Sequence, residues 1–204
     1  PGSNGRLRAR GKWGIFGGLM KTQFSGFRCF RCGTEQGADF GGYVCPACGG
    51  NLEVRYAWPQ GAPAGWWRDE SRKDVFRYRP LLPVSRLELA SPLRVGLTPL
   101  YAAPRLGASA GLNHLFLKDD GQNPSASFKD RAGAVALVRA REIGAQVLCG
   151  ASTGNAGSSM ACLAASVAMP CVIFVPEKAP AAKIAQLLVF GARVLAVQGS
   201  YDDA

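Results

Sequence analysis

An alternation of short apolar runs and helix-length segments, beginning near Gly96, constrains the fold more than any other feature of the sequence. The apolar runs read as strands over residues 115–118, 146–149, 171–175 and 193–197. The segments with helical patterns cover residues 128–143, 154–167 and 181–190. Apolar strands joined by helices of this length are typical of a parallel sheet with helices on both faces. The pattern therefore predicts an α/β fold with a parallel sheet and flanking helices for residues 96–204.

Composition divides the preceding part of the sequence into three zones. We interpret residues 1–26 as a basic, flexible leader, residues 27–56 as a small cysteine-bearing domain and residues 57–95 as a connecting segment. The net charge of +10 is partly local, because seven cationic side chains precede Glu35, the first acidic residue. Residues before Met20, a natural start site, fit a tag, upstream translation or a targeting arm equally well.

Two Cys-x-x-Cys pairs predict a metal site. Cys29 and Cys32 form the first pair, Cys45 and Cys48 form the second, and twelve residues separate the pairs. Four thiolates arranged in this way close a tetrahedral zinc site, and a glycine after each pair permits the tight turn. Because sulfur fills all four coordination positions, we expect the zinc to be structural.

Other interpretations of the cysteine region remain open. The four cysteines could form two disulfides or include a redox pair, although no signal-peptide segment precedes them. A zinc ribbon could also bind nucleic acid, since Phe24, Phe27 and Phe30 alternate with Arg28 and Arg31. The same pattern suits a small core with a solvated rim, and we do not expect nucleic acid as a partner.

The hydropathy pattern argues against a membrane protein. The longest apolar stretch, residues 160–175, contains Pro170 and is shorter than the roughly 18 residues that a spanning helix needs. Together with the lack of a signal peptide, this favours a reducing compartment, and we expect a cytoplasmic protein.

Residues 118–131, KDDGQNPSASFKDR, lead from a predicted strand into a helix and place Lys129 in its first turn. Ser127 suits the N-cap position and Asp130 suits the first turn. The positive end of the helix dipole disfavours the ammonium form of a lysine there, and a neutral amine can attack an aldehyde. An exposed lysine beside Asp130 is the alternative.

Residues 151–157, ASTGNAG, form a second loop between a strand and a helix. Its backbone N–H groups and two hydroxyls suit an anion such as a carboxylate. In parallel sheets, ligands bind at the carboxyl ends of the strands. We therefore expect the two loops to lie at adjacent strand ends and to meet across one crevice.

The segments NPSASFKDR and STGNAG, preceded by LTPL at residues 97–100, resemble the fold-type II family of pyridoxal phosphate (PLP) enzymes, which has the tryptophan synthase β-like fold. The cysteine ribbon, with FRYR at residues 76–79 before LLP at residues 81–83, resembles the threonine synthases within it. The resemblance implies that Lys129 is the Schiff-base lysine and the general base, and that Asn155 binds the pyridine 3-hydroxyl. It further implies a substrate-binding loop made of Ser152, Thr153, Gly154, Asn155 and Ala156.

This family converts O-phosphohomoserine, an amino-acid phosphoester, and water to threonine and phosphate. A PLP-dependent eliminating or replacing enzyme, such as a threonine dehydratase, is the alternative, because Ala156 stands where many relatives carry threonine. The resemblance also places a glycine loop for the PLP phosphate beyond Ala204, and an acidic pair at Asp202 and Asp203 suits a helix start with no helix after it. We therefore expect a truncated sequence, with a homodimer as one candidate assembly of the protein.

Overall fold

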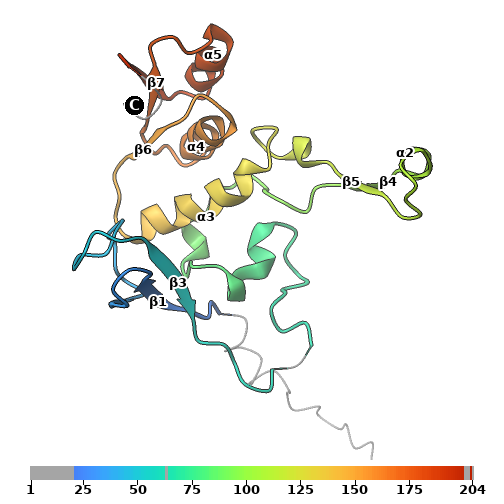
Figure 1. The fold of residues 1–204 in the computed structure, drawn as a ribbon, viewed down its shortest axis with the longest axis horizontal. Coiled ribbons are helices and arrows are strands. Elements are labelled where there is room, and N and C mark those ends of the chain that lie inside the picture. The colour runs from blue at the N-terminus through green and yellow to red at the C-terminus, as the bar shows by residue number, and fades with distance from the viewer. Residues whose placement is uncertain (1–20, 63, 200–202, 204) are drawn as a thin grey trace, which may run out of the picture.

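A computed structural model describes residues 21–62, 64–199 and 203 (Figure 1). Residues 1–20 of the predicted leader lie outside these ranges. The described helices α3, α4 and α5 lie in the second half of the chain. In chain order, the elements that form the body of the molecule are β1 (Phe24–Cys29), β2 (Glu35–Gly37), β3 (Leu52–Tyr56), the 3-10 turns η1 (Val75–Leu81) and η2 (Leu87–Leu89), β4 (Leu100–Ala102), α2 (Pro104–Ser109), β5 (Phe116–Lys118), η3 (Asp120–Gln122), α3 (Lys129–Glu142), β6 (Leu148–Ala151), α4 (Asn155–Ala165), β7 (Cys171–Pro176), α5 (Ala181–Val189) and β8 (Arg193–Val197).

The cysteine region is an antiparallel sheet of three strands in the order β2-β1-β3. The central strand, β1, pairs with β2 and with β3, and Cys29 at its end lies opposite Leu52. The first pair of cysteines lies at the end of β1 and in the turn to β2, and the loop from β2 to β3 carries the second pair.

The second half of the chain contains a parallel sheet in the order β6-β7-β8. Cys171, Ile173 and Val175 of β7 are buried and pack with Ala164 of α4 and Leu187 of α5. Strands β6 and β7 are each followed by a helix, as the sequence predicts. Strand β8 has the predicted bounds, whereas β6 begins two residues later than predicted.

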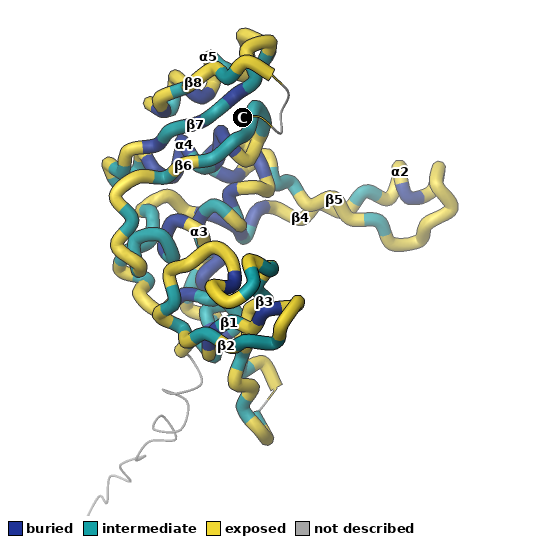
Figure 2. Tube along the Cα trace, turned by 60° about the vertical axis from the view of Figure 1, so that its left-hand side comes forward, coloured by how far each residue is buried: buried dark blue, intermediate teal, exposed yellow. Residues whose placement is uncertain are grey.

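The prediction of a purely parallel sheet is wrong for the strand at residues 115–118. Strand β5 pairs antiparallel with β4 in a separate sheet of two strands. Figures 1 and 2 show this hairpin, with α2 at its tip, extending away from the rest of the molecule. An apolar run predicts a strand but does not specify its partner, and the short segment between β4 and β5 allows them to form a hairpin.

Helix α3 lies at the centre of the molecule, between the cysteine sheet and the parallel sheet (Figure 1). The connecting segment packs against it, because Val75, Phe76, Val84 and Val95 share one core cluster with Leu137. The other buried members of this cluster are Ala134, Val138 and Leu163. Residues 75–95 are thus part of the body on which α3 rests.

Within the described ranges, we find no helix with the length and apolar character that membrane crossing would require.

Candidate cofactor and metal sites

The start of α3 is held by hydrogen bonds from the loop that precedes it. The Ser127 hydroxyl accepts a hydrogen bond from the Lys129 N–H at 3.1 Å, although the N-cap residue of α3 is Phe128 and not, as the sequence predicts, Ser127. Asp130 is fully buried and accepts hydrogen bonds from the Ser125 N–H at 2.7 Å and the Ser125 hydroxyl at 2.6 Å. These contacts fix the backbone on both sides of Lys129.

A second set of polar contacts ties this loop to the segment before β4. Arg131 donates to Asp120 Oδ1 at 2.7 Å and to the Thr98 hydroxyl at 3.2 Å, and Thr98 in turn donates to Asp120 at 2.7 Å. The hydrogen bond from Arg131, aided by Thr98, lowers the pKa of Asp120 to about 2. The side chain of Asn123 accepts from the Gly96 N–H at 2.9 Å. The sequence motifs assigned no roles to these residues, although each lies in or next to one of those motifs.

Lys129 is exposed, and its amine is available for reaction. The amine nitrogen lies 4.7 Å from the centre of the Phe128 ring. It makes no hydrogen bond or ion pair with any residue that the structure describes. A ligand that approaches α3 from solvent can therefore reach this amine without breaking an ion pair.

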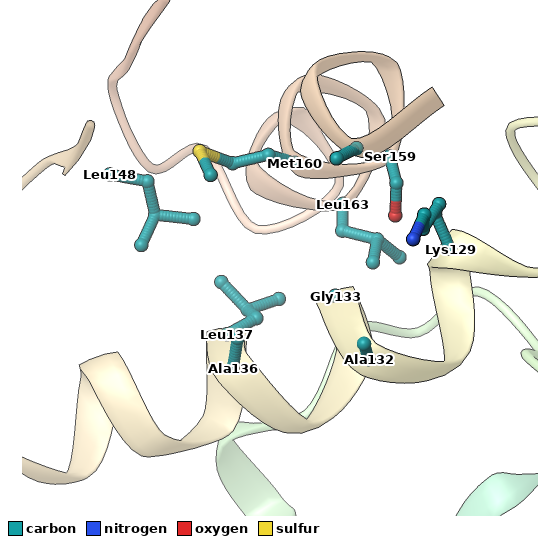
Figure 3. Close-up of a pocket in the computed structure, with 10 residues that line it drawn as sticks. Lys129, Ala132, Gly133, Ala136, Leu137, Leu148, Ser159, Met160 and Leu163 are labelled. Carbon is teal, nitrogen blue, oxygen red and sulfur yellow. The ribbon is translucent and has the colours of Figure 1, made fainter. Parts of the chain in front are cut away.

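A cavity of about 310 Å³ lies between α3 and α4 (Figure 3). Lys129 and Ala156 both line it, so the structure brings the predicted lysine and one residue of the predicted glycine loop to the same cavity. The full lining consists of Lys129, Ala132, Gly133, Ala136, Leu137, Leu148, Ala156, Ser159, Met160 and Leu163. We predicted that the two loops meet because they lie at adjacent strand ends. In the structure they meet because α3 packs against α4.

The two helices approach closely at Gly133. A Cβ atom at this position would lie 2.5 Å from Ser159 Oγ and 2.9 Å from Leu163 Cδ1. Real Cβ atoms do not make contacts this short, so a larger residue would require the side chains of Ser159 and Leu163, or the helices themselves, to shift. Glycine at position 133 therefore permits the close approach of α3 and α4 seen here.

Within the glycine loop, the Ser152 side chain binds two of the loop's own backbone amides. Ser152 Oγ accepts hydrogen bonds from the Gly154 N–H at 3.3 Å and the Gly157 N–H at 3.1 Å. Two of the amides that could bind an anion thus bind a hydroxyl oxygen in this structure. Thr153 and Gly154 are half-buried, whereas Asn155 and Ala156 are exposed at the start of α4. Asn155 does not line the cavity itself but directly precedes Ala156, which does.

The four predicted cysteine ligands converge on one point. Their sulfur atoms all lie within 4.8 Å of one another. Cys29 and Cys48 have their sulfurs 3.5 Å apart, and Cys32 and Cys45 have theirs 3.6 Å apart. Tetrahedral zinc with Zn–S bonds of about 2.3 Å requires sulfur–sulfur distances of roughly 3.8 Å. The observed distances fit this requirement, and they exceed the S–S bond length of about 2.0 Å in a disulfide.

The local structure of the cysteine pairs also suits a metal. Cys29 and Cys45 are buried, and the N–H groups of Gly33 and Gly49 donate to their carbonyl oxygens at 3.0 and 2.8 Å. Hydrogen bonds from Thr34 lower the pKa of Cys32 to about 6. Against a lowering hydrogen bond from Gly50, hydrogen bonds with the neighbouring sulfurs raise the pKa of Cys48 to about 12, so the four thiols share their protons unequally when no metal is bound. The site can therefore hold a metal ion with four sulfur ligands.

Helix α3 connects this cluster to the lysine. Near the C-terminal end of the helix, Arg139 donates to the Phe40 carbonyl at 2.8 Å and lies over the rings of Phe24 and Phe27, at 5.5 and 5.7 Å from their centres. The N-terminal end of the same helix carries Lys129. The position of the cysteine sheet and the position of the amine are thus set by one rigid element.

The chain is similar to several known proteins. Threonine synthase of Methanocaldococcus jannaschii is 38% identical over 181 residues, and that of Methanosarcina acetivorans is 36% identical over 178 residues. Each match covers 87% of this chain and 44% of the relative, so the chain spans less than half the length of these curated relatives. Among solved structures, threonine deaminase isoform 2 of Solanum lycopersicum is 25% identical with a TM-score of 0.47, over 52% of this chain and 29% of that chain. Maize serine racemase is 24% identical, with the same TM-score, over 52% of this chain and 32% of that chain.

The sequence pattern of the pyridoxal-phosphate dependent enzymes matches residues 92–204, which contain both loops and both helices of the cavity. This match covers more than half of the chain. The chain therefore belongs to the pyridoxal-phosphate dependent enzymes.

Proposed function

We propose that the protein is a threonine synthase, which converts O-phosphohomoserine and water to threonine and phosphate. The observation that carries the proposal is the unpaired amine of Lys129 at a cavity that the glycine loop also lines. The similarity to threonine synthases supports the choice within the family, because it covers 87% of the chain and so includes more than the cofactor region.

The residues at this cavity fit pyridoxal phosphate. Lys129 would hold the cofactor covalently through its aldehyde, and Asn155 would donate a hydrogen bond to the ring hydroxyl. Both side chains are exposed at the start of their helices, so a ring can reach them. When bound, the cofactor supplies a conjugated ring that accepts electrons from the substrate carbon that loses a proton.

The protein's own groups would orient the substrate and move its protons. The N–H groups at the start of α4 and the positive end of its dipole would bind the substrate carboxylate, and the Ser152 hydroxyl would turn from those amides toward the same group. Thr153, Gly154 and Ala156 would complete the wall of this subsite. Lys129 Nζ, once free, would accept a proton from one substrate carbon and return it to another. The apolar lining would exclude water from the amine.

We further propose that the four cysteines bind a structural zinc ion. Sulfur ligands and the convergent, partly buried geometry favour zinc over harder cations. The unpaired thiols among the described residues are consistent with the reducing conditions of the cytoplasm, where we propose that the protein works.

A threonine dehydratase-like reaction is the second candidate. It is favoured by Ala156, which contributes only a methyl group to the cavity wall. Phosphate and threonine from O-phosphohomoserine would support the first candidate, and ammonia with a 2-oxo acid from threonine would support the second.

The test of the cofactor assignment is chemical labelling of the protein in its full natural length. Incubation with pyridoxal phosphate, followed by borohydride reduction and peptide mass spectrometry, should place the label on Lys129. Lys129→Ala should lose the label and the activity, while Lys178→Ala, which removes another exposed lysine, should keep both. A label that persists in Lys129→Ala would contradict the assignment.

A further inference from the structure

Ser159 of α4 is a buried side chain without a hydrogen-bond partner. Its relative exposure is 1%, and its hydroxyl oxygen is one of three buried side-chain polar atoms that lack a partner among the described residues. Buried hydroxyl groups are nearly always hydrogen-bonded, and an unpaired one needs an explanation. No role was assigned to Ser159 by the sequence motifs.

The surroundings of Ser159 leave one suitable partner. Ser159 lines the cavity between α3 and α4, and eight of the other nine lining residues are glycine or have apolar side chains. The ninth is Lys129. Figure 3 shows the hydroxyl of Ser159 and the amine of Lys129 at the same end of the cavity. Gly133 lies one helical turn after Lys129 and has no side chain that could separate them.

We propose that Ser159 is a positioning residue that hydrogen-bonds the Lys129 amine when the amine turns from the Phe128 ring into the cavity. This inference rests on the proposed role of Lys129. A serine hydroxyl both donates and accepts, so it can pair with the neutral amine and with the ammonium form. The contact therefore survives as Lys129 Nζ takes up and releases protons.

The same contact would prepare the amine for the cofactor. Covalent capture requires the Nζ lone pair to attack the aldehyde carbon, after which a C=N bond replaces C=O and the oxygen leaves as water with the two amine hydrogens. A Ser159 oxygen that accepts one N–H bond restricts the rotation of the amine and orients its lone pair. Correct orientation of a reacting group accelerates such a step without a change in its chemistry.

The experiment compares Ser159→Ala with Ser158→Ala in the full-length protein. Ser158 is the neighbouring residue, with 2% exposure, and does not line the cavity. We expect Ser159→Ala to lower the rate of borohydride-reducible capture of pyridoxal phosphate about tenfold, the effect of one hydrogen bond to a charged or reacting group. The label should remain on Lys129, kcat should fall by a similar factor, and KM should change little. Ser158→Ala should keep the wild-type capture rate.

Thermal unfolding separates positioning from a structural role. Because Ser159→Ala removes an unpaired buried hydroxyl, the melting temperature should stay the same or rise. A wild-type capture rate in Ser159→Ala would overturn the inference, as would a variant that is slow only because it is unfolded or less stable. A label on a residue other than Lys129 would instead overturn the proposed function.

Discussion

The cysteine sheet and the α3–α4 pair stay folded by different means. Among the described residues of the cysteine sheet, only Phe24, Cys29 and Cys45 are buried hydrophobic residues, and neither core cluster includes them. The α3–α4 pair contributes Ala134, Leu137, Val138 and Leu163 to one cluster, and α4 contributes Ala161 and Ala164 to the other. The cysteine sheet buries little apolar area, whereas the α3–α4 pair is stabilised by the apolar area that it buries.

This difference shows where each region can tolerate change. A sheet with a small core depends on its four sulfur ligands, because metal binding supplies its folding free energy. Two closely packed helices depend on the size of each side chain between them. The reactive lysine lies at the edge of the second region, so its position is set by packing. The cysteine sheet contacts that region through Arg139 and through hydrogen bonds such as the one from the Tyr56 hydroxyl to the Leu81 carbonyl.

The largest effect should follow loss of the metal. Chelation, or Cys45→Ser, should unfold residues 24–56, since a structural zinc site contributes on the order of 10 kcal/mol. Hydrogen exchange should then show fast amides in β1–β3 and unchanged protection in β6–β8. Cys149→Ser, which changes an exposed cysteine outside the cluster, should retain the metal. Protected amides in the chelated cysteine sheet would show that its small core is sufficient.

A smaller loss of stability should follow when a buried side chain between α3 and α4 is shortened. Leu163 is 1% exposed, and Leu163→Ala should lower the free energy of unfolding by about 2–5 kcal/mol because it leaves a cavity between the helices. Leu188→Ala, at a residue that is 54% exposed, should change it by less than about 0.5 kcal/mol. Urea denaturation measures both values. Equal effects would mean that the α3–α4 contact is not tightly packed in solution.

The Arg139 contact between the two regions should contribute less to the free energy of unfolding than the metal site or the α3–α4 core. Arg139→Met keeps most of the side-chain length but removes the hydrogen bond to Phe40 and the charge over the two rings. We expect a loss of about 1–2 kcal/mol in the free energy of unfolding, with metal content unchanged. Arg193→Met, at an exposed strand residue, serves as the control. Separate unfolding transitions of the two regions in wild-type protein would contradict a coupling through Arg139.

The smallest effect should be a loss of stability in acid. The pKa of Asp120 in the folded protein is about 2, below its ordinary value of 3.8. A lowered folded-state pKa stabilises the protein above pH 4, and this contribution disappears as the pH falls from about 4 to 2. Asp120→Asn should reduce the slope of stability against pH in that window, by on the order of 1 kcal/mol in total, because the ion pair is partly solvated. An unchanged slope would show that Arg131 does not hold Asp120 in solution.

Local features of the fold were predictable from a few adjacent residues. The bounds of β8 and the convergence of the four sulfurs follow from periodicity and the spacing of cysteines. The lysine and the glycine loop were identified from their place at predicted helix starts together with the resemblance to PLP enzymes. Asp130 was predicted to suit the first turn, but its burial and its contacts with Ser125 required the structure.

The sequence by itself indicated the helices and strands from residue 115 onward, which four cysteines gather, and which amine is placed at a helix start, but it did not predict β4 or α2. The tertiary structure decided that β5 pairs with β4, that Gly133 meets Ser159, and that Arg139 lies on the cysteine sheet. The reason is physical. Helix starts and cysteine turns depend on interactions among neighbouring residues, whereas strand pairing and helix packing depend on side chains far apart in the chain, whose fit has no local signature.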